Sequence, residues 1–143
     1  MPNPWGEFSN TILRFANGAI IDLRISLDEP ARAILARFGI DGSFGIVTAC
    51  NPDGVMQPSV VNRQRAAALE QELEERGIPW VPIDACSPDG SHCEASVILT
   101  RPRDEVIALA RRYSQLAIFW FDGADAWIVP VLANHPPLRL PAQ

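Results

Sequence analysis

The sequence predicts a single α+β domain built on a largely antiparallel sheet, and three observations lead to this prediction. Short runs rich in β-branched and aromatic residues recur along the chain between turn formers. Residues 59–76 and 102–113 instead repeat their apolar residues at helical spacing. Alternation of polar and apolar residues over 92–100 is typical of a strand with one solvated face, which favours antiparallel pairing. The 143 residues, 48% of them hydrophobic, suffice for one core.

The N-terminal part of the chain, residues 8–39, is expected to form a hairpin followed by a short helix. Asn17 and Gly18 are the strongest short-range signal for a hairpin turn, and β-rich runs lie on both sides of them. The helix is expected over residues 31–38, because acidic residues and Pro30 precede it and a glycine follows it.

The core, residues 44–132, is expected to alternate strands and helices. Its first strand, residues 44–50, is a short apolar run that stops at Asn51 and Pro52, and Pro52 biases the backbone of Asn51 away from the α region. The longest helix is expected to be capped by Ser59. In order, the expected elements are a strand at 44–50, a helix at 59–76, strands at 80–85 and 92–100, a helix at 102–113, and strands at 115–121 and 126–132.

Up to residue 121, this order is the split βαββαβ pattern of a ferredoxin-like core. We expect the helices to pack on one face of the sheet. The N-terminal hairpin and a C-terminal hairpin, turning at Asp122 and Gly123, are added to this core. The Pro-rich tail, residues 133–143, is expected to be irregular.

Composition and charge narrow the classes of function. The 12 basic residues are outnumbered by 17 acidic ones, and a net charge of -5 gives no general attraction to phosphate backbones, so no nucleic acid partner is expected. No apolar stretch has the roughly 18 residues that span a bilayer, and the N-terminus lacks a signal-peptide pattern. The odd number of cysteines (Cys50, Cys86 and Cys93) favours reduced thiols. We therefore expect a soluble cytoplasmic protein without a membrane partner.

Polar residues are expected to meet at the end of the strand over residues 44–50. In the expected topology, the strands that begin at His92 and Gln115 run antiparallel on either side of it, so their first residues lie beside its last. A step of four residues back from the buried stripe of the long helix places Asn62 inward, with Arg65 flanking the same rim. Period-two alternation places three residues of one strand on a common face: His92, Glu94 and Ser96.

Four segments in this order resemble a known family of small bacterial proteins, the domain of unknown function 3293. The segments are Thr48-Ala49-Cys50-Asn51-Pro52, Asn62 with the helix that follows it, His92-Cys93-Glu94-Ala95-Ser96, and Gln115-Leu116-Ala117-Ile118-Phe119-Trp120. The resemblance covers roughly residues 44–130 and implies no activity. It implies that the following residues match the family's motif positions: Thr48, Asn51, Pro52, Asn62, His92, Glu94, Ser96 and Gln115.

Two hypotheses of function follow, and whether the protein is an enzyme stays open between them. The first is a rim site that binds a small polar or anionic metabolite, with His92 and Glu94 as an acid–base pair. Its ligand-binding residues are Asn51, Asn62, Arg65, Ser96 and Gln115. The second is a non-catalytic interaction module, compatible with a homodimer, in which the same polar residues only support the structure.

Two further chemistries have weaker signals. Zinc would need three or four convergent ligands, and only His92, Glu94 and either Cys86 or Cys93 offer themselves, so neither a metal nor a cofactor is expected. Cys50 lies near His92 in the expected topology and is a candidate nucleophile, but buried cysteines are commonly inert.

Overall fold

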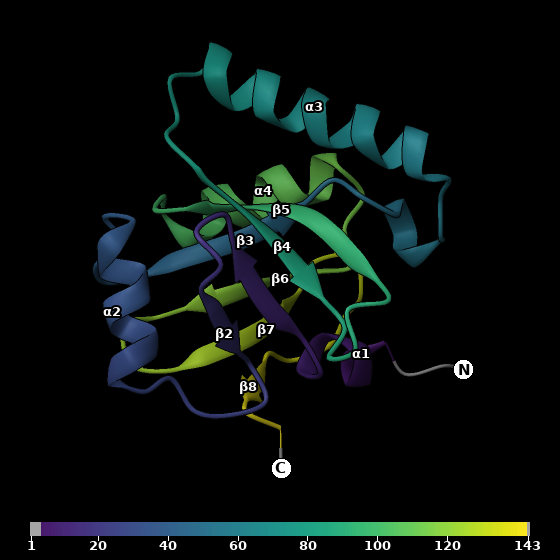
Figure 1. Cartoon of the computed structure of the whole chain (residues 1–143). Coiled ribbons are helices and arrows are strands. Elements are labelled where there is room, and N and C mark those ends of the chain that lie inside the picture. Colours follow the sequence, from purple (N-terminus) through teal and green to yellow (C-terminus); the bar gives the residue numbers. More distant parts are fainter. Residues whose placement is uncertain (1–3, 143) are drawn as a thin grey trace.

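The computed structural model describes residues 4–142, which form a mixed structure of helices and one antiparallel sheet (Figure 1). The α+β class is therefore confirmed. In chain order the elements are α1 (Trp5–Ser9), β1 (Ile12–Phe15), β2 (Ile20–Asp22), α2 (Glu29–Arg37), β3 (Phe44–Thr48), a 3-10 turn (Pro52–Gly54), α3 (Ser59–Glu75), β4 (Val81–Cys86), β5 (Cys93–Leu99), α4 (Arg103–Arg112), β6 (Ala117–Phe121), β7 (Ala126–Pro130) and β8 (Leu138–Leu140).

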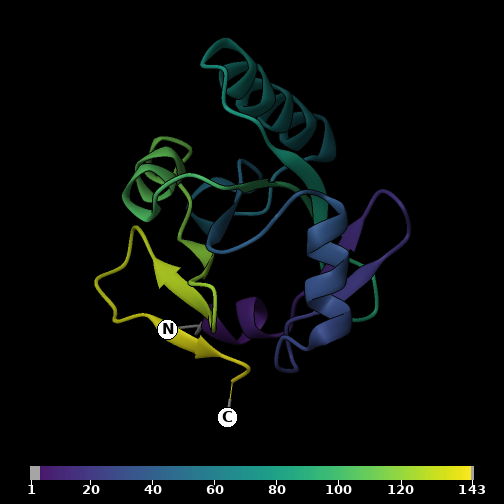
Figure 2. The same cartoon turned by 90° about the vertical axis from the view of Figure 1, so that its left-hand side faces the viewer.

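The eight strands form one sheet in the order β2-β1-β4-β5-β3-β6-β7-β8, and every neighbouring pair is antiparallel. The sheet curls into a half-barrel whose two edges are β2 and β8 (Figure 2). The predicted position of β3 between β5 and β6 is confirmed, with Thr48 opposite Ser96 and Ile46 opposite Phe119. The predicted N-terminal hairpin is also confirmed, as β1 and β2.

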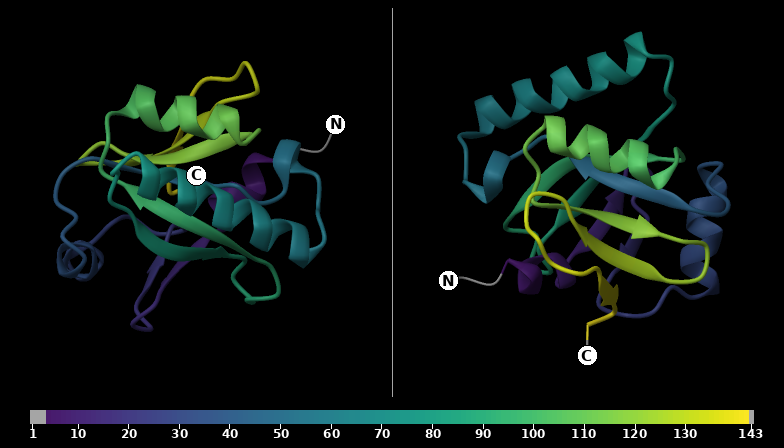
Figure 3. Two further views of the ribbon diagram at one scale, coloured as in Figure 1. Left: turned by 90° about the horizontal axis from the view of Figure 1, so that it is seen from above. Right: turned by 180° about the vertical axis from the view of Figure 1, so that it is seen from behind.

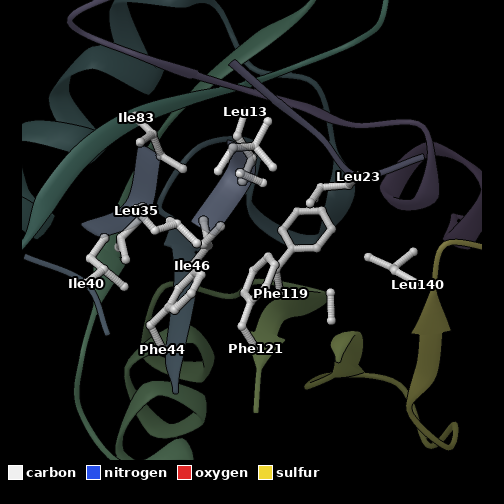
Figure 4. Close-up of a cluster of buried hydrophobic side chains, with 14 of the residues drawn as sticks. Leu13, Leu23, Leu35, Ile40, Phe44, Ile46, Ile83, Phe119, Phe121 and Leu140 are labelled. Atoms are coloured by element: carbon white, nitrogen blue, oxygen red, sulfur yellow. The ribbon is translucent and has the colours of Figure 1, made fainter. Parts of the chain in front are cut away.

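Side chains from all eight strands meet inside the curl, and we call them the concave cluster (Figure 4). It includes Leu13 of β1, Ile46 of β3, Phe119 of β6 and Leu140 of β8. Burying a side chain of this size contributes about 1.5–3 kcal/mol. The concave cluster therefore ties the two ends of the chain to its middle.

A second core, the convex cluster, lies between the outer face of the sheet and the helices α3 and α4 (Figure 3). Leu69 and Leu73 of α3 and Val106 of α4 are fully buried in it. Gly45 of β3 allows α4 to approach closely, since a Cβ atom at this position would lie 2.8 Å from Cγ1 of Val106. None of the helices in residues 4–142 has the length and apolar character needed to cross a membrane.

The helices differ from the expectation in two respects. α3 and α4 share one face of the sheet, but Ala31 and Leu35 of α2 belong to the concave cluster, so the placement of all helices on one face was wrong. Pro58, not Ser59, is the N-cap of α3, and no side chain caps this end. The backbone of Pro58 is extended, so the helix begins at the next residue. Ser59 is therefore the first helical residue of α3 and not its N-cap.

The tail also differs, because it is not wholly irregular. β8 pairs with β7, with Leu138 opposite Ile128 and Leu140 opposite Ala126. Its three residues are too few to give a periodic signal between prolines. An edge strand needs hydrogen bonds on one side only, so nearby prolines are tolerated.

The expectation that all the cysteines are reduced thiols was wrong. Cys86 and Cys93 form a disulfide across the β4–β5 hairpin, and Cys50 is free and buried. The two bonded residues stand directly opposite each other in the strand register. Spacing along the chain hid this pairing, because a hairpin brings together residues that are seven positions apart.

Candidate functional site

The chain after β3 turns sharply at Asn51, whose backbone is left-handed with φ of 49°. Pro52 excludes the right-handed helical region, as expected, and Asn is one of the few residues that tolerate the left-handed one. The Asn51 N–H donates to Oδ1 of Asn62 at 2.9 Å, and Nδ2 of Asn62 donates back to Oδ1 of Asn51 at 2.9 Å. The N–H of Gln57 also donates to Oδ1 of Asn51, at 2.8 Å. This reciprocal amide pair fixes the loop that leads to α3.

Two longer side chains tie the same loop to Tyr113, at the end of α4. Arg65 donates from Nε to the carbonyl oxygen of Ala49 at 2.6 Å and from Nη2 to that of Tyr113 at 2.8 Å. Nε2 of Gln115 lies 3.1 Å from the carbonyl oxygens of both Cys50 and Tyr113. We call Asn51, Asn62, Arg65 and Gln115 the loop brace, because their hydrogen bonds go mainly to the main chain or to each other.

A cleft of about 600 Å³ opens on the other side of the β3 end, within the half-barrel. α1 and the turn between β4 and β5 both supply residues to its lining, and they lie close together at one end of the sheet (Figure 1). Its polar lining consists of Glu7, Asn10, Thr11, Thr48, Ser87, Ser91, His92, Glu94 and Ser96. Its larger apolar lining residues are Phe8, Ile46, Met56 and Phe119.

Glu94 links the cleft to the loop brace. Its Oε2 accepts a hydrogen bond of 2.7 Å from Nδ2 of Asn51. Burial raises the pKa of the Glu94 carboxyl above its usual value, and Glu7 adds to this rise. The hydrogen bond from Asn51 and the nearby His92 act in the opposite direction. Among the ion pairs of residues 4–142, none includes Glu94.

His92 and Ser96 line the cleft together with Glu94, as the period-two pattern predicted. The main chain of His92 is fixed by the hairpin turn, where its N–H donates to Oγ of Ser87 at 3.1 Å. Its side chain is exposed, and within the described part of the chain its imidazole makes no hydrogen bond. Ser96 is 5% exposed, and its hydroxyl donates to the carbonyl oxygen of Glu94 at 3.0 Å.

The predicted rim residues therefore separate into two groups. His92, Glu94 and Ser96 share the cleft, and Asn51 reaches it through its bond to Glu94. The other three predicted ligand-binding residues, Asn62, Arg65 and Gln115, do not belong to the cleft lining. The prediction of an anionic ligand loses its main support, because the Arg65 guanidinium, the expected cationic partner, is bonded to main-chain carbonyls and does not line the cleft.

Sequence reasoning missed the residues that α1 and the start of β1 bring to the cleft. Glu7, Phe8 and Thr11 line it, yet α1 has five residues and no side-chain cap. So short a helix has no periodic pattern to detect. Thr48, in contrast, stands at a position that the family resemblance had marked, and its hydroxyl donates to the carbonyl oxygen of Ala95 at 2.8 Å.

The cysteines offer neither a nucleophile nor a metal ligand in this cleft. Burial raises the pKa of the Cys50 thiol, which favours the protonated and unreactive form. Cys86 and Cys93 are bonded to each other, so neither provides the thiolate that the zinc alternative required. Within residues 4–142, no three His, Cys, Asp or Glu residues are grouped so that they could hold a metal ion.

Comparison with known proteins gives one match. A family model described as protein of unknown function (DUF3293) matches residues 47–118. No curated protein and no solved structure matches the chain. The matched range contains the whole loop brace as well as His92, Glu94 and Ser96, whereas Glu7 and Phe8 lie outside it. The chain therefore belongs to the DUF3293 family.

Proposed function

We propose that the protein binds a small polar organic molecule in the cleft, with Glu94 as the group that recognises it. The observation that carries this proposal is a half-buried carboxylate on the wall of a 600 Å³ cleft whose exposed lining is mostly apolar. Small-molecule sites commonly combine an apolar lining with a few fixed polar groups. Asn51 fixes the orientation of this carboxylate, since it donates to one of its two oxygens.

Acid–base chemistry by His92 and Glu94 stays a prediction. Both side chains line the cleft, and the raised pKa of Glu94 favours the protonated form, which can act as an acid, more than in an exposed carboxyl. They are not hydrogen bonded to each other in the described structure, so His92 would act on the ligand and not through Glu94.

A screen of metabolites by thermal shift tests the proposed site. Glu94→Gln keeps an oxygen that can accept the Asn51 hydrogen bond but removes the charge. The matched control is Asp84→Asn, the same chemical change at an exposed residue of β4 that does not line the cleft. We expect Glu94→Gln and His92→Ala each to weaken the stabilisation by hits that bond to the replaced side chain, and Asp84→Asn to retain it. Hits that stabilise all variants equally would remove the site from the cleft.

The second hypothesis, a structural role for the polar residues, is favoured for part of the set. Asn62, Arg65 and Gln115 direct their hydrogen bonds to the loop after β3. An interaction module would use the edge strands β2 and β8, which could pair with a second copy. Light scattering at increasing concentration tests for such a homodimer.

We further propose that β3, α3, β4, β5, α4 and β6 make up a ferredoxin-like core. The support for this is the order β4-β5-β3-β6 in the middle of the sheet, with α3 and α4 on one face. A cytoplasmic location also stays a prediction, although the disulfide between Cys86 and Cys93 weakens the argument from reduced thiols.

A further inference from the structure

We propose that the ligand of the cleft is an organic amine, whose ammonium group pairs with Glu94 while its hydrocarbon body lies against Phe8 and Phe119. This inference rests on the proposed function and gives it a ligand class. The sequence-based expectation was a polar or anionic metabolite, and this inference replaces it with a cation.

The first support is the incomplete bonding of Glu94. A carboxylate withdrawn from water is normally paired with a cation, because desolvation of an isolated charge is costly. The hydrogen-bond partner of the Glu94 carboxylate in the described structure is the neutral amide of Asn51, which bonds Oε2. A ligand ammonium in the cleft would give this carboxylate a cationic partner.

The second support is the charge around the cleft. Glu7 comes from α1, and its negative charge adds to that of Glu94. The basic side chain in the lining is that of His92, which is exposed. Arg65, the cation of the loop brace, bonds to main-chain carbonyls instead. An anion entering the cleft would approach two carboxylates, whereas a cation would relieve the repulsion between them.

The third support is the apolar wall, which favours an organic cation over a metal ion. The rings of Phe8 and Phe119 meet edge to face with centroids 5.8 Å apart, and Ile46 and Met56 also line the cleft. Hydrocarbon buried against such a wall is stabilised in proportion to the apolar area that leaves water. A bare divalent cation would leave this surface unused and would require more oxygen ligands than one carboxylate pair provides.

Three probes with the same hydrocarbon body test the inference: 2-phenylethylamine, 2-phenylethanol and phenylacetate. Binding to the full chain is followed by NMR titration at pH 7, with the chemical shifts of cleft residues as the readout. We expect the amine to bind about tenfold more tightly than the alcohol, the gain of roughly one charge-assisted hydrogen bond, and phenylacetate to bind most weakly.

Variants separate the amine class from the site itself. In Glu94→Gln, the amine and the alcohol should bind with equal affinity. The affinity for the alcohol should stay within about twofold of that of wild type, because the variant keeps the apolar contacts with the phenyl ring. Asp84→Asn should keep the full preference for the amine. Thermal melts confirm that each variant is folded.

The outcomes of this titration distinguish the proposal of an amine ligand from the proposal of a binding site in the cleft. If the alcohol or phenylacetate binds in the cleft at least as tightly as the amine, the amine class is wrong and the site stands. If the preference for the amine survives in Glu94→Gln, the pairing with Glu94 is wrong. If no probe moves the resonances of cleft residues at millimolar concentration, both the ligand class and the cleft site are overturned.

Discussion

The loop brace and the cleft lie on opposite sides of the end of β3, and they use their polar residues differently. In the loop brace, the amide of Asn62 and the guanidinium of Arg65 are occupied by hydrogen bonds to neighbouring loop atoms. In the cleft, the carboxylate of Glu94 has a single neutral partner and His92 has a free imidazole within the described structure.

Whether the hydrogen bonds of a side chain are complete distinguishes a structural role from a binding role more clearly than the position of the residue in the sheet does. All these residues were expected at one rim, and all come from strand or helix ends near β3. Side chains whose hydrogen bonds are complete stabilise the fold, whereas incomplete ones on a cavity wall are available to a ligand. The comparison predicts that substitutions in the loop brace affect stability and that substitutions in the cleft affect binding.

The largest effect is expected at Asn51. Asn51→Ala removes three side-chain hydrogen bonds and places a less tolerant residue in a left-handed conformation. We expect the free energy of unfolding to fall by about 3 kcal/mol, measured by urea denaturation. Asn51→Gly, which loses the same bonds without the backbone penalty, should lose less. Equal stability of Asn51→Ala and wild type would mean that the brace does not hold the loop.

Loss of the Cys86–Cys93 disulfide should have the next largest effect, because it ties a wall of the cleft covalently. The bond closes a loop with a sequence separation of seven residues, and its removal should cost about 2 kcal/mol. Urea denaturation of wild type with and without a thiol reductant measures this cost. Cys50→Ala should keep the response to the reductant, and a Cys86→Ala/Cys93→Ala variant should lose it. If the urea midpoint of wild type did not change on addition of the reductant, the Cys86–Cys93 disulfide would not contribute to stability.

An effect of similar size is expected at Arg65. Arg65→Met keeps much of the aliphatic stem but removes the donors to the carbonyl oxygens of Ala49 and Tyr113, at a cost of about 2 kcal/mol. Arg63→Met on the same helix is the control, since Arg63 is exposed and should change stability by less than about 0.5 kcal/mol. If both variants behave alike in urea, Arg65 is not part of a brace.

The smallest effect on stability is expected at Glu94, and it should depend on pH. The folded state holds the Glu94 proton more tightly than the unfolded state does, because burial raises the pKa. Ionised Glu94 therefore costs stability above its folded pKa, and this cost disappears as the pH falls below its usual value of 4.5. Glu94→Gln should be as stable as wild type or up to about 1 kcal/mol more stable at pH 7.

Comparison of urea midpoints at pH 7 and pH 4 measures this dependence. The advantage of Glu94→Gln over wild type should shrink at pH 4, where wild-type Glu94 is mostly protonated in both states. The same comparison with Asp84→Asn corrects for the general effect of removing a carboxylate. If the stability of Glu94→Gln relative to wild type instead increased at low pH, the pKa of Glu94 would be lowered by folding, and its ionised carboxylate would stabilise the folded state.

Most of the fold could be predicted because its elements carry local signals. Asn17 and Gly18 mark a hairpin, and Leu69 and Leu73, four residues apart, mark the buried face of a helix. α1 and β8 could not be predicted, because they are too short for a periodic pattern and owe their structure to contacts with distant strands. The disulfide was missed for the same reason, since strand register and not spacing brings its cysteines together.

The site was predicted only in part. Period-two alternation correctly grouped His92, Glu94 and Ser96, because the pleat of a strand enforces it. The direction in which Arg65 points could not be read from the sequence, because a long side chain can reach either a ligand or a carbonyl. Its place in the loop brace depends on the main chain of Tyr113, 48 residues away.

The concave cluster reaches well beyond the part of the chain that defines the family. Within residues 47–118 it contains only Ile83, Ile98 and Ala117, and its other members come from the flanking segments. A protein shortened to the family borders would expose one whole face of its remaining strands and would lose Glu7 and Phe8. A relative that shared the matched motifs but had other flanks would have to fill the half-barrel with other residues, which would change the size and shape of the cleft.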